Sequence, residues 1–202
     1  MQTHDFSQSS KRERTYKHTF FNERMQIYIV RHGQASHNVK KVLDENPKHK
    51  TNLTPKGIRQ VQNRAEQLKH IPLDIIFTSQ FPRALQTARI INNYHYVNLK
   101  SDRRLNERKT GMDQQPIRKW KKISKKNNFQ IKLPRGESFQ EEKKRLRLFL
   151  SSLKKMPYRH VLVVTHSEPL QIILGLLKNF SDQEMMKIKP RNAQLFMHVL
   201  KK

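Results

Sequence analysis

An arginine, a histidine and a glycine stand directly after a β-branched and aromatic run near the start of the chain. The run is "IYIV", and Arg31, His32 and Gly33 follow it. Arginine and histidine are costly to bury without partners, and glycine weakens a strand, so packing alone does not explain the triplet. A guanidinium fits phosphoryl oxygens, and a neutral imidazole, which nearby positive charge favours, can attack phosphorus. The triplet suggests phosphoryl transfer, but alone it is only a hypothesis.

Two other strand-like runs end in polar residues that suit the same chemistry. The run "LDIIFTS" ends in Thr78 and Ser79 shortly before Arg83, and "HVLVVTH" ends in Thr165 and His166. In a parallel sheet the binding crevice lies beyond the carboxyl ends of the strands. We therefore expect these side chains to meet the arginine and histidine of the first run at one edge of a sheet.

The elements that must position these residues alternate between strands and helices. Apolar runs predict strands over 25–30, 73–79, 160–166 and 195–200. Helical patterns are predicted over 51–70, 81–92, 136–155 and 168–178. Such alternation predicts an α/β fold, a three-layer sandwich with a mostly parallel central sheet and helices on both faces.

Capping residues and one apolar face support two of these helices. Thr54 is expected to cap the helix within 51–70, with Pro55 at its first position, and Ser138 with Glu141 forms a capping box for the helix within 136–155. One buried face of the first of these helices is predicted to hold four apolar residues: Ile58, Val61, Ala65 and Leu68.

Composition limits the classes of protein and partner. The 202 residues contain 42 Lys and Arg against 16 Asp and Glu, a net charge of +26. Such a field attracts phosphorylated metabolites, nucleic acid or acidic lipid surfaces. The chain has no cysteine, which excludes disulfides and thiolate metal sites. We expect a cytoplasmic protein without a membrane span or membrane partner, with organelle targeting by the N-terminal segment left open.

Two segments differ from the rest of the chain. Residues 1–24 are expected to form a basic, disordered tail before a single domain over 25–202. Residues 114–136 contain eight Lys or Arg and no acid, which predicts a small basic cap insertion at about 112–136. We expect this cap to favour polyanionic substrates, with a nucleic-acid patch or a solvated face as alternatives. Trp120 within it could stack on a base or cover a pocket, but a hydrophobic anchor is favoured.

Six motifs occur in a fixed order along the chain. They are "VRHGQASHN", "LTPKGIRQ", "TSQFPRALQTA", "RLNERKTG", "RGES" and "VLVVTHSEP". Together they resemble the signature of the histidine phosphatase superfamily, also called phosphoglycerate mutase-like, and they extend over most of residues 25–200.

The resemblance implies a role for each matching residue. His32 would be the nucleophile that becomes phosphohistidine. Arg31, Arg83 and His166 would hold the phosphoryl oxygens and stabilise the charge of the transition state. Glu107 would protonate the leaving oxygen and then activate water.

The resemblance also implies a substrate-binding role for Asn38, which would help to hold the phosphate, and we add Gln34 and Ser167 as substrate-binding residues. Neither a metal nor another cofactor is expected, because the cationic pocket would supply the charge that Mg²⁺ otherwise brings.

Several residues have plainer alternatives. Glu107 lies among basic residues and could form only a solvated ion pair, and Asn38 could serve as a turn or cap residue. Three further histidines lack a catalytic context and are predicted at the surface: His37, His49 and His70.

The chain departs from the superfamily pattern in two places. A glycine usually follows the second histidine, whereas Ser167, Glu168 and Pro169 stand there. Ser167 is expected to cap the next helix with Pro169 in its first turn, and Glu168 either weakens phosphate binding or lies at the helix N-terminus. The Gly-Trp turn of the mutases is absent, and the chain is short for a mutase.

Three functions follow from these patterns. The favoured one is a metal-independent phosphatase that hydrolyses phosphomonoesters of a small substrate or a phosphopeptide through phosphohistidine at His32. The second is a phosphoglycerate mutase, which returns the phosphoryl group to another hydroxyl. The third is a phosphate- or nucleic-acid-binding module that retains the fold. The net charge of +26 is the observation that suggests it.

Overall fold

Five strands form one sheet in the part of the chain that the computed structural model describes, residues 24–124, 129 and 131–201. In the order β3-β2-β4-β1-β5 they comprise β1 (Arg24–Arg31), β2 (Ile75–Thr78), β3 (Asn98–Ser101), β4 (His160–Thr165) and β5 (Leu195–Lys201). The pairs β1–β4, β2–β4 and β2–β3 are parallel, and β5 runs antiparallel to β1. The predicted, mostly parallel sheet is confirmed.

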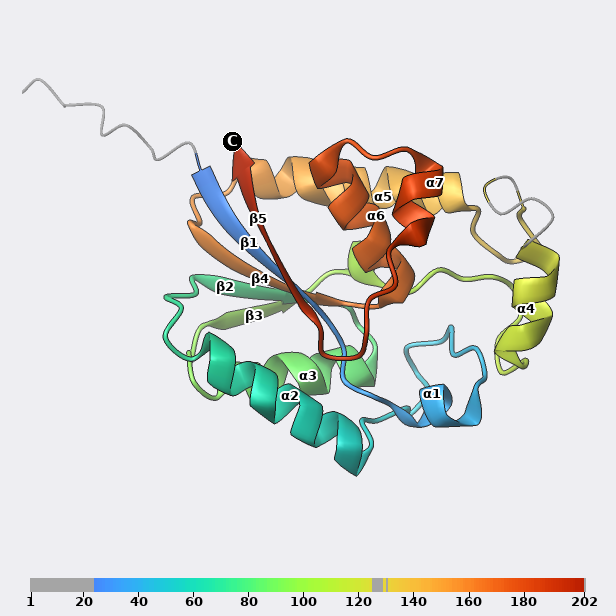
Figure 1. Ribbon diagram of the computed structural model, residues 1–202, viewed down its shortest axis with the longest axis horizontal. Helices are drawn as coiled ribbons and strands as arrows, with labels where there is room; N and C mark the ends of the chain where they lie inside the picture. Colours follow the sequence, from blue (N-terminus) through green and yellow to red (C-terminus); the bar gives the residue numbers. More distant parts are fainter. Residues whose placement is uncertain (1–23, 125–128, 130, 202) are drawn as a thin grey trace, which may run out of the picture.

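Helices cover both faces of this sheet (Figure 1). One face packs against α2 (Pro55–Leu68) and α3 (Pro82–Asn92), and the other against α5 (Phe139–Lys154) and α6 (Ser167–Lys178). Successive residues of a strand point to opposite faces, so β1 supplies both apolar clusters, Ile29 to the α5–α6 side and Val30 to the α2–α3 side. The three-layer sandwich follows from strands that are apolar on both faces.

Short elements connect these layers. They are α1 (Ser36–Lys40), the 3₁₀ helix η1 (Arg103–Leu105), α4 (Ile117–Ser124) and α7 (Asp182–Lys187). The sequence patterns missed them and also missed β3, whose sequence "NLKS" contains no apolar run. β3 lies at the edge of the sheet with most of its residues exposed, so it needs little apolar character.

The predicted helix starts are confirmed. The Thr54 hydroxyl oxygen accepts the Gly57 N–H at 3.0 Å, and Pro55 is the first residue of α2. Ser138 and Glu141 form the expected capping box at the start of α5.

The prediction for the buried face of α2 is wrong at one position. Val61, Ala65 and Leu68 are buried, but Ile58 is 39% exposed, and Gly57 takes its place on the buried face. A Cβ on Gly57 would lie 2.0 Å from the backbone oxygen of Gln34. At this position the buried face of α2 makes a backbone contact in place of an apolar side-chain contact.

A close backbone approach joins α2 to the chain segment after β1. A Cβ on Gly33 would lie 2.6 Å from the Gly57 oxygen and 2.7 Å from Cγ2 of Val61. Glycine at both positions lets the start of α2 press against the residues that directly follow His32.

The two segments outside the predicted core are only partly described. Arg24, which we assigned to the tail, is the first residue of β1 and pairs with Lys201 of β5. The rest of the predicted tail lies outside the described residues. The predicted cap contains α4, while its residues 125–128 and 130 also lie outside the described part. Among the described residues, no helix has the length and apolar character that a bilayer crossing needs.

Candidate active site

The carboxyl ends of three parallel strands meet at one edge of the sheet, as predicted. His32 follows β1, Ser79 follows β2 and His166 follows β4. The His32 N–H donates to the Thr165 oxygen at 2.9 Å, and the Ser79 N–H donates to the Val164 oxygen at 3.1 Å. The ring centroids of the two histidines lie 5.1 Å apart. The backbone pairing of the sheet therefore brings the two imidazoles together.

His32 is buried with a defined tautomer. Its Nδ1 lies 2.7 Å from the Gly33 carbonyl oxygen, which can only accept a hydrogen bond, so Nδ1 carries the proton. The Nε2 atom keeps its lone pair. Burial lowers the pKa of His32 well below its usual value, and the charges of Arg83 and Arg31 lower it further. The ring is thus neutral at neutral pH, the state in which it can act as a nucleophile.

Arg83 is held by a buried ion pair. Its guanidinium donates from Nη1 to Oδ2 of Asp44 at 2.6 Å and from Nη2 to the Asp44 backbone oxygen at 3.2 Å, and it lies 4.3 Å from the ring centroid of Phe81. Burial lowers the pKa of Arg83 to about 10, with Asp44 opposing the shift, so the group remains charged at neutral pH. Arg31 is fixed by a 2.7 Å hydrogen bond from Nη1 to the Pro190 oxygen.

Glu107 lies in the same field of positive charge. Burial raises its pKa, and the charges of Arg83 and Arg31 oppose that rise. A carboxyl group with a raised pKa retains a proton that it can donate, which is what a general acid requires. Glu107 forms no salt bridge among the described residues, and two of its basic neighbours pair with other acids, Arg104 with Asp102 and Arg108 with Glu168.

Four buried nitrogen atoms around His32 lack a hydrogen-bond partner among the described residues. They are Nε of Arg31, Nδ1 of His37, Nε of Arg83 and Nδ1 of His166. An unpaired buried polar group costs about 1–3 kcal/mol, so such groups are rare unless a ligand completes them. Their gathering around one imidazole fits a ligand that brings several acceptor oxygens, as a phosphoryl group does.

The second histidine is oriented by Ser79. Nε2 of His166 lies 2.7 Å from the Ser79 oxygen, and the Phe81 ring packs against the imidazole with centroids 4.9 Å apart. Burial lowers the pKa of His166 well below its usual value, with Arg83 as the largest charge contribution. Because Nε2 is bound to Ser79, Nδ1 is the ring nitrogen of His166 that remains without a partner among the described residues and could bind a ligand.

Two of the three histidines predicted at the surface are not there. His37 is half-buried with its ring centroid 5.7 Å from that of His32, and His49 is half-buried beside Asp44. Only His70 is exposed. His37 enters the site because α1 turns the chain back immediately after the arginine–histidine–glycine triplet, and its position five residues after His32 was the signal available in the sequence.

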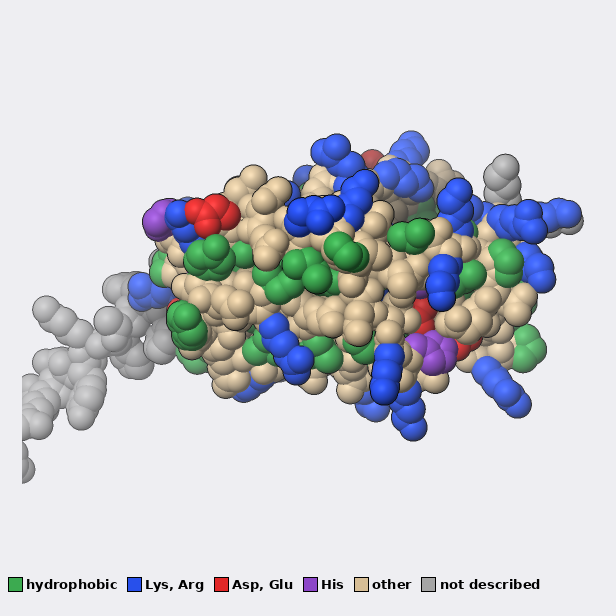
Figure 2. Space-filling model, turned by 90° about the horizontal axis from the view of Figure 1, so that it is seen from below, with side chains coloured by type: hydrophobic (Ala, Val, Ile, Leu, Met, Phe, Trp, Pro, Cys, Tyr) green, Lys and Arg blue, Asp and Glu red, His purple; other side chains and the backbone are tan. Residues whose placement is uncertain are grey.

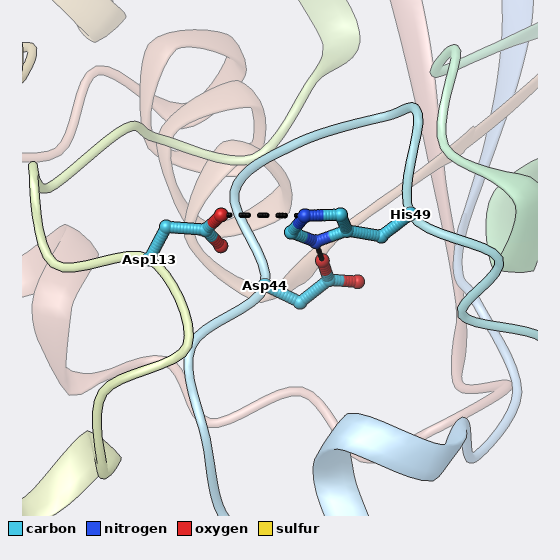
Figure 3. A group of neighbouring side chains, drawn as sticks. All are labelled: Asp44, His49 and Asp113. Atoms are coloured by element: carbon cyan, nitrogen blue, oxygen red, sulfur yellow. Dashed lines mark hydrogen bonds and ion pairs between the residues drawn. The ribbon is translucent and has the colours of Figure 1, made fainter.

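Asp44 is a site residue that the sequence patterns missed, because its loop has no periodicity and no motif. The Asp44 side chain is fully buried, and its Oδ1 lies 2.8 Å from Nδ1 of His49. Nε2 of His49 lies 3.6 Å from Oδ2 of Asp113, so the ring bridges two carboxylates, with each nitrogen facing a different one (Figure 3). Asp44 also binds Arg83, so these residues form a chain of alternating ionisable groups that holds that arginine.

Asn38 and Gln34 make bonds that organise the backbone. Oδ1 of Asn38 accepts the Ala35 N–H at 3.0 Å and lies 3.4 Å from Nδ2 of Asn192. Oε1 of Gln34 accepts the hydroxyl of Thr54 at 2.9 Å. Asn192 was not singled out from the sequence, although its Nδ2 also donates to the His32 oxygen at 3.2 Å.

Comparisons with known proteins agree with this geometry. The family model of the histidine phosphatase superfamily (branch 1) matches residues 27–201. The chain belongs to the histidine phosphatase superfamily. It is 30% identical over 176 residues to a candidate phosphoserine phosphatase 2 of Hydrogenobacter thermophilus, covering 83% of this chain and 85% of the relative.

Other relatives have different names. A candidate phosphoglycerate mutase of Proteus mirabilis is 28% identical over 180 residues, covering 85% of this chain and 83% of the relative. The crystal structure of the alpha-ribazole phosphatase from Shigella flexneri shares the fold with a TM-score of 0.77 at 23% identity, covering 86% of this chain and 89% of that one. The superfamily thus includes phosphatases and mutases among the relatives of this chain.

The departure from the superfamily pattern after the second histidine has a structural counterpart. His166 itself, with extended backbone, is the N-cap of α6, and Ser167 is the first helical residue, so the prediction that Ser167 caps the helix is wrong. Only His166 separates the end of β4 at Thr165 from the first residue of α6 at Ser167. Pro169 lies in the first turn of α6, as predicted.

The carboxylate of Glu168 is neutralised by a buried arginine. Oε1 of Glu168 lies 2.8 Å from Nη2 of Arg108, which is 2% exposed and also lies 3.8 Å from the buried Glu142. Arg108 lies over the Trp120 ring, 5.1 Å from its centroid. Trp120 is buried and anchors α4, as we favoured from the sequence. An acid at this position therefore binds Arg108 at the start of α6.

Two crevices reach the site from different sides. The larger, of about 960 Å³, includes Phe81 and Glu107 in its lining. The smaller, of about 590 Å³, includes Arg31, Gln34 and Asn192. His32 lines neither crevice and is itself only 1% exposed.

The Glu168–Arg108 cluster predicts how the free energy of unfolding depends on pH. Burial raises the pKa of Glu168 to about 7, so between pH 4.5 and 7 the folded chain binds more protons than the unfolded chain. The contribution of this group to stability is then expected to fall as pH rises through this window, by at most ~1.4 kcal/mol per pH unit. The lowered pKa values of His32, His37 and His166 act in the opposite direction. Glu168→Gln should remove only the contribution of Glu168, so the slope of its free energy of unfolding against pH, measured in urea, should be more positive than that of wild type.

The matched control for this experiment is Glu66→Gln, which changes a carboxyl on the solvent side of α2. It should leave the slope between pH 4.5 and 7 unchanged. Identical pH profiles for wild type and Glu168→Gln would show that Glu168 ionises as an ordinary exposed carboxyl does.

Proposed function

We propose that this protein is a metal-independent phosphomonoesterase that acts through a phosphohistidine at His32. The observation that carries the proposal is the neutral, buried imidazole of His32, whose Nε2 keeps its lone pair. Around it lie four buried nitrogens that find no partner in the described part of the chain. Arg31 and Arg83 supply the positive charge that a phosphoryl transition state requires, so the charge does not have to come from a metal.

The first chemical step transfers the phosphoryl group to the protein. Nε2 of His32 forms a bond to phosphorus while the bond from phosphorus to the leaving oxygen breaks, and Glu107 gives that oxygen its proton. The ring gains a positive charge, which the Gly33 carbonyl stabilises through Nδ1–H. The leaving alcohol departs through the larger crevice, which Glu107 lines.

The second step returns the site to its starting state. The Glu107 carboxylate takes a proton from water as the water oxygen attacks phosphorus. The bond between nitrogen and phosphorus breaks, inorganic phosphate leaves, and His32 is neutral again.

The loop after α1 favours hydrolysis over mutase activity, because it lacks the Gly-Trp turn of the mutases. In its place Asp44 binds Arg83. The Glu45 carboxylate accepts the N–H groups of Thr110 at 2.9 Å and Gly111 at 3.1 Å.

The larger crevice supports a substrate with a second anionic group. Three of its cations form no salt bridge among the described residues: Arg103, Lys109 and Arg135. Its other cations are paired with acids, as Arg145 is with Glu137. The cationic field at this rim would concentrate polyanionic phosphate esters, including phosphopeptides, near Glu107.

Only part of the basic cap lies where it could bind a polyanionic substrate. Lys121 and Lys122 are exposed on α4 and do not line the crevice, while Lys132 and Arg135 from the end of the segment do. Lys125 and Lys126 lie outside the described residues. The end of the segment is therefore the part that we assign to substrate binding.

Nucleic-acid binding has weaker support. Figure 2 shows lysine and arginine side chains scattered over the face that α2 and α3 form, without one continuous patch. A nucleic-acid backbone is usually followed by a stripe of cations. The proposal therefore keeps to phosphate esters.

The nucleophile assignment predicts an acid-labile phosphoenzyme. With chelator present, wild type incubated with an aryl phosphate and quenched in base should carry phosphate that mild acid releases. His32→Gln should carry none and should lose turnover, because the covalent route is gone while the buried polar side chain keeps much of the packing. Intact-protein mass spectrometry measures both states.

His70→Gln, a change at an exposed histidine, is the control and should behave like wild type. A phosphoenzyme that survives acid, or full turnover by His32→Gln, would remove His32 from the nucleophile role.

The acid assignment predicts a dependence on the leaving group. Glu107→Gln should slow hydrolysis of alkyl phosphates by about 10²-fold or more and of nitrophenyl phosphate much less, because a nitrophenolate leaves without a proton. Steady-state kcat values for the two substrate types measure the ratio. Glu141→Gln, an exposed acid at the same crevice, should change neither value. Equal slowing of both substrates would show that Glu107 is not the leaving-group acid.

The cations Arg103, Lys109 and Arg135 of the larger crevice, which form no salt bridge within the described residues, predict a preference for substrates with more than one negative group. Arg103→Gln combined with Lys109→Gln should raise KM for a bisphosphate severalfold and leave KM for nitrophenyl phosphate nearly unchanged. The difference should shrink as the Debye length falls from ~10 Å at 0.1 M salt to ~3 Å at 1 M. Lys121→Gln with Lys122→Gln is the matched control, since it removes the same charge away from the crevice. Equal effects of both double variants would mean that only net charge matters.

A further inference from the structure

His37 presents a hydrogen-bonding edge next to the nucleophile. It lies in α1, its ring is half-buried, and its centroid is 5.7 Å from that of His32. Its Nδ1 is one of the four buried nitrogens around His32 that have no partner among the described residues. The chemistry of this atom depends on which ring nitrogen carries the proton.

The hydrogen bonds of Asn38 fix the tautomer of His37. The Ala35 N–H can only donate, so the atom of Asn38 that lies 3.0 Å from it must be the amide oxygen. The amide nitrogen of Asn38 then faces Nε2 of His37 at 2.8 Å. An amide NH₂ group only donates, so Nε2 of His37 must accept with its lone pair. A neutral His37 ring therefore carries its proton on Nδ1.

His37 also stays neutral. Burial lowers the pKa of His37 to about 3, and the charges of Arg83 and Arg31 contribute to the shift. The ring therefore places a neutral, buried N–H donor among the cationic and neutral donors around His32, and no acceptor for it lies among the residues that the structure describes. Leaving such a donor unpaired costs about 1–3 kcal/mol, so an acceptor from a ligand would stabilise it.

We propose that His37 is a further ligand of the phosphoryl group, with its Nδ1–H donating to a non-bridging phosphoryl oxygen. The inference rests on the proposed function and gives a role to a residue of the first motif to which the superfamily resemblance assigned none. The donor strengthens as negative charge builds on the oxygen in the transition state. Because His37 is neutral, it adds a directional contact without a third positive charge next to the buried guanidinium groups.

A purely structural role for His37 is the competing explanation. In that case the ring matters only because it accepts the Asn38 amide and thereby holds the turn after Gly33. The two roles use different ring nitrogens, so side chains that replace one nitrogen at a time can separate them.

Three variants carry out this separation. In His37→Asn the amide nitrogen can occupy the position of Nδ1 and keep the donor. In His37→Gln the longer side chain reaches the position of Nε2, where its oxygen can accept from Asn38 while the Nδ1 donor is lost. His37→Leu removes both groups. His70→Gln is the control for loss of an exposed imidazole.

The readouts are kcat/KM for nitrophenyl phosphate and the dissociation constant of vanadate, an anion that resembles the transition state. His37→Leu and His37→Gln should lose about 10- to 100-fold in kcat/KM and weaken vanadate binding, whereas His37→Asn should recover most of both. Thermal unfolding checks that each variant is folded. Wild-type values for His37→Leu, or recovery by His37→Gln and not by His37→Asn, would overturn the proposal.

Failure of the proposed function can be distinguished from failure of this inference. If wild type forms no phosphohistidine, the proposed function fails, yet calorimetric titration with vanadate or inorganic phosphate needs no turnover and still compares the variants. If the phosphoenzyme forms and vanadate binds His37→Leu as tightly as wild type, only the role of His37 fails.

Discussion

Two guanidinium groups held away from water at the end of β1 and at the start of α3 are the constraint on which the rest of the site depends. An unpaired buried charge costs several kcal/mol, so Arg83 needs the buried carboxylate of Asp44, and that carboxylate in turn binds His49. Burial, together with these charges, lowers the pKa of the surrounding imidazoles and keeps them neutral. A phosphoryl group would replace solvent that these arginines have lost. The site is therefore organised around positive charge that the fold only partly compensates.

Most of the fold could be predicted because local patterns and the core agree. β1 and β4 are apolar on both faces, and Thr54 and Ser138 start their helices with side-chain oxygens. Where tertiary contacts decide, local patterns fail. Gly57 displaces Ile58 from the buried face because a backbone contact, and not apolar area, is what α2 presents there. β3 shows no pattern because an edge strand has little to bury.

The candidate site divides in the same way. Residues that end parallel strands, such as His32 and His166, could be predicted because those ends converge at one edge whatever the loops do. Residues from irregular segments could not, because Asp44 and Arg108 reach the site only through contacts between distant parts of the chain. His37 was assigned to the surface because it has no catalytic context in the sequence, although the short helix α1 turns it inward.

The close approach of Gly33 and Gly57 divides this part of the chain into positions that cannot change and positions that can. Any side chain at either glycine would push α2 away from His32, so these positions are closed to variation. Between them, the loop after α1 is tied by backbone hydrogen bonds between Lys41 or Leu43 and residues 114–117, and its Asp44 holds Arg83. Its exposed residues, such as Lys48 and Lys50, can change without moving His32. In evolutionary terms, His32 stands in a fixed frame, and the sequence beside it is free to vary only where the loop faces solvent.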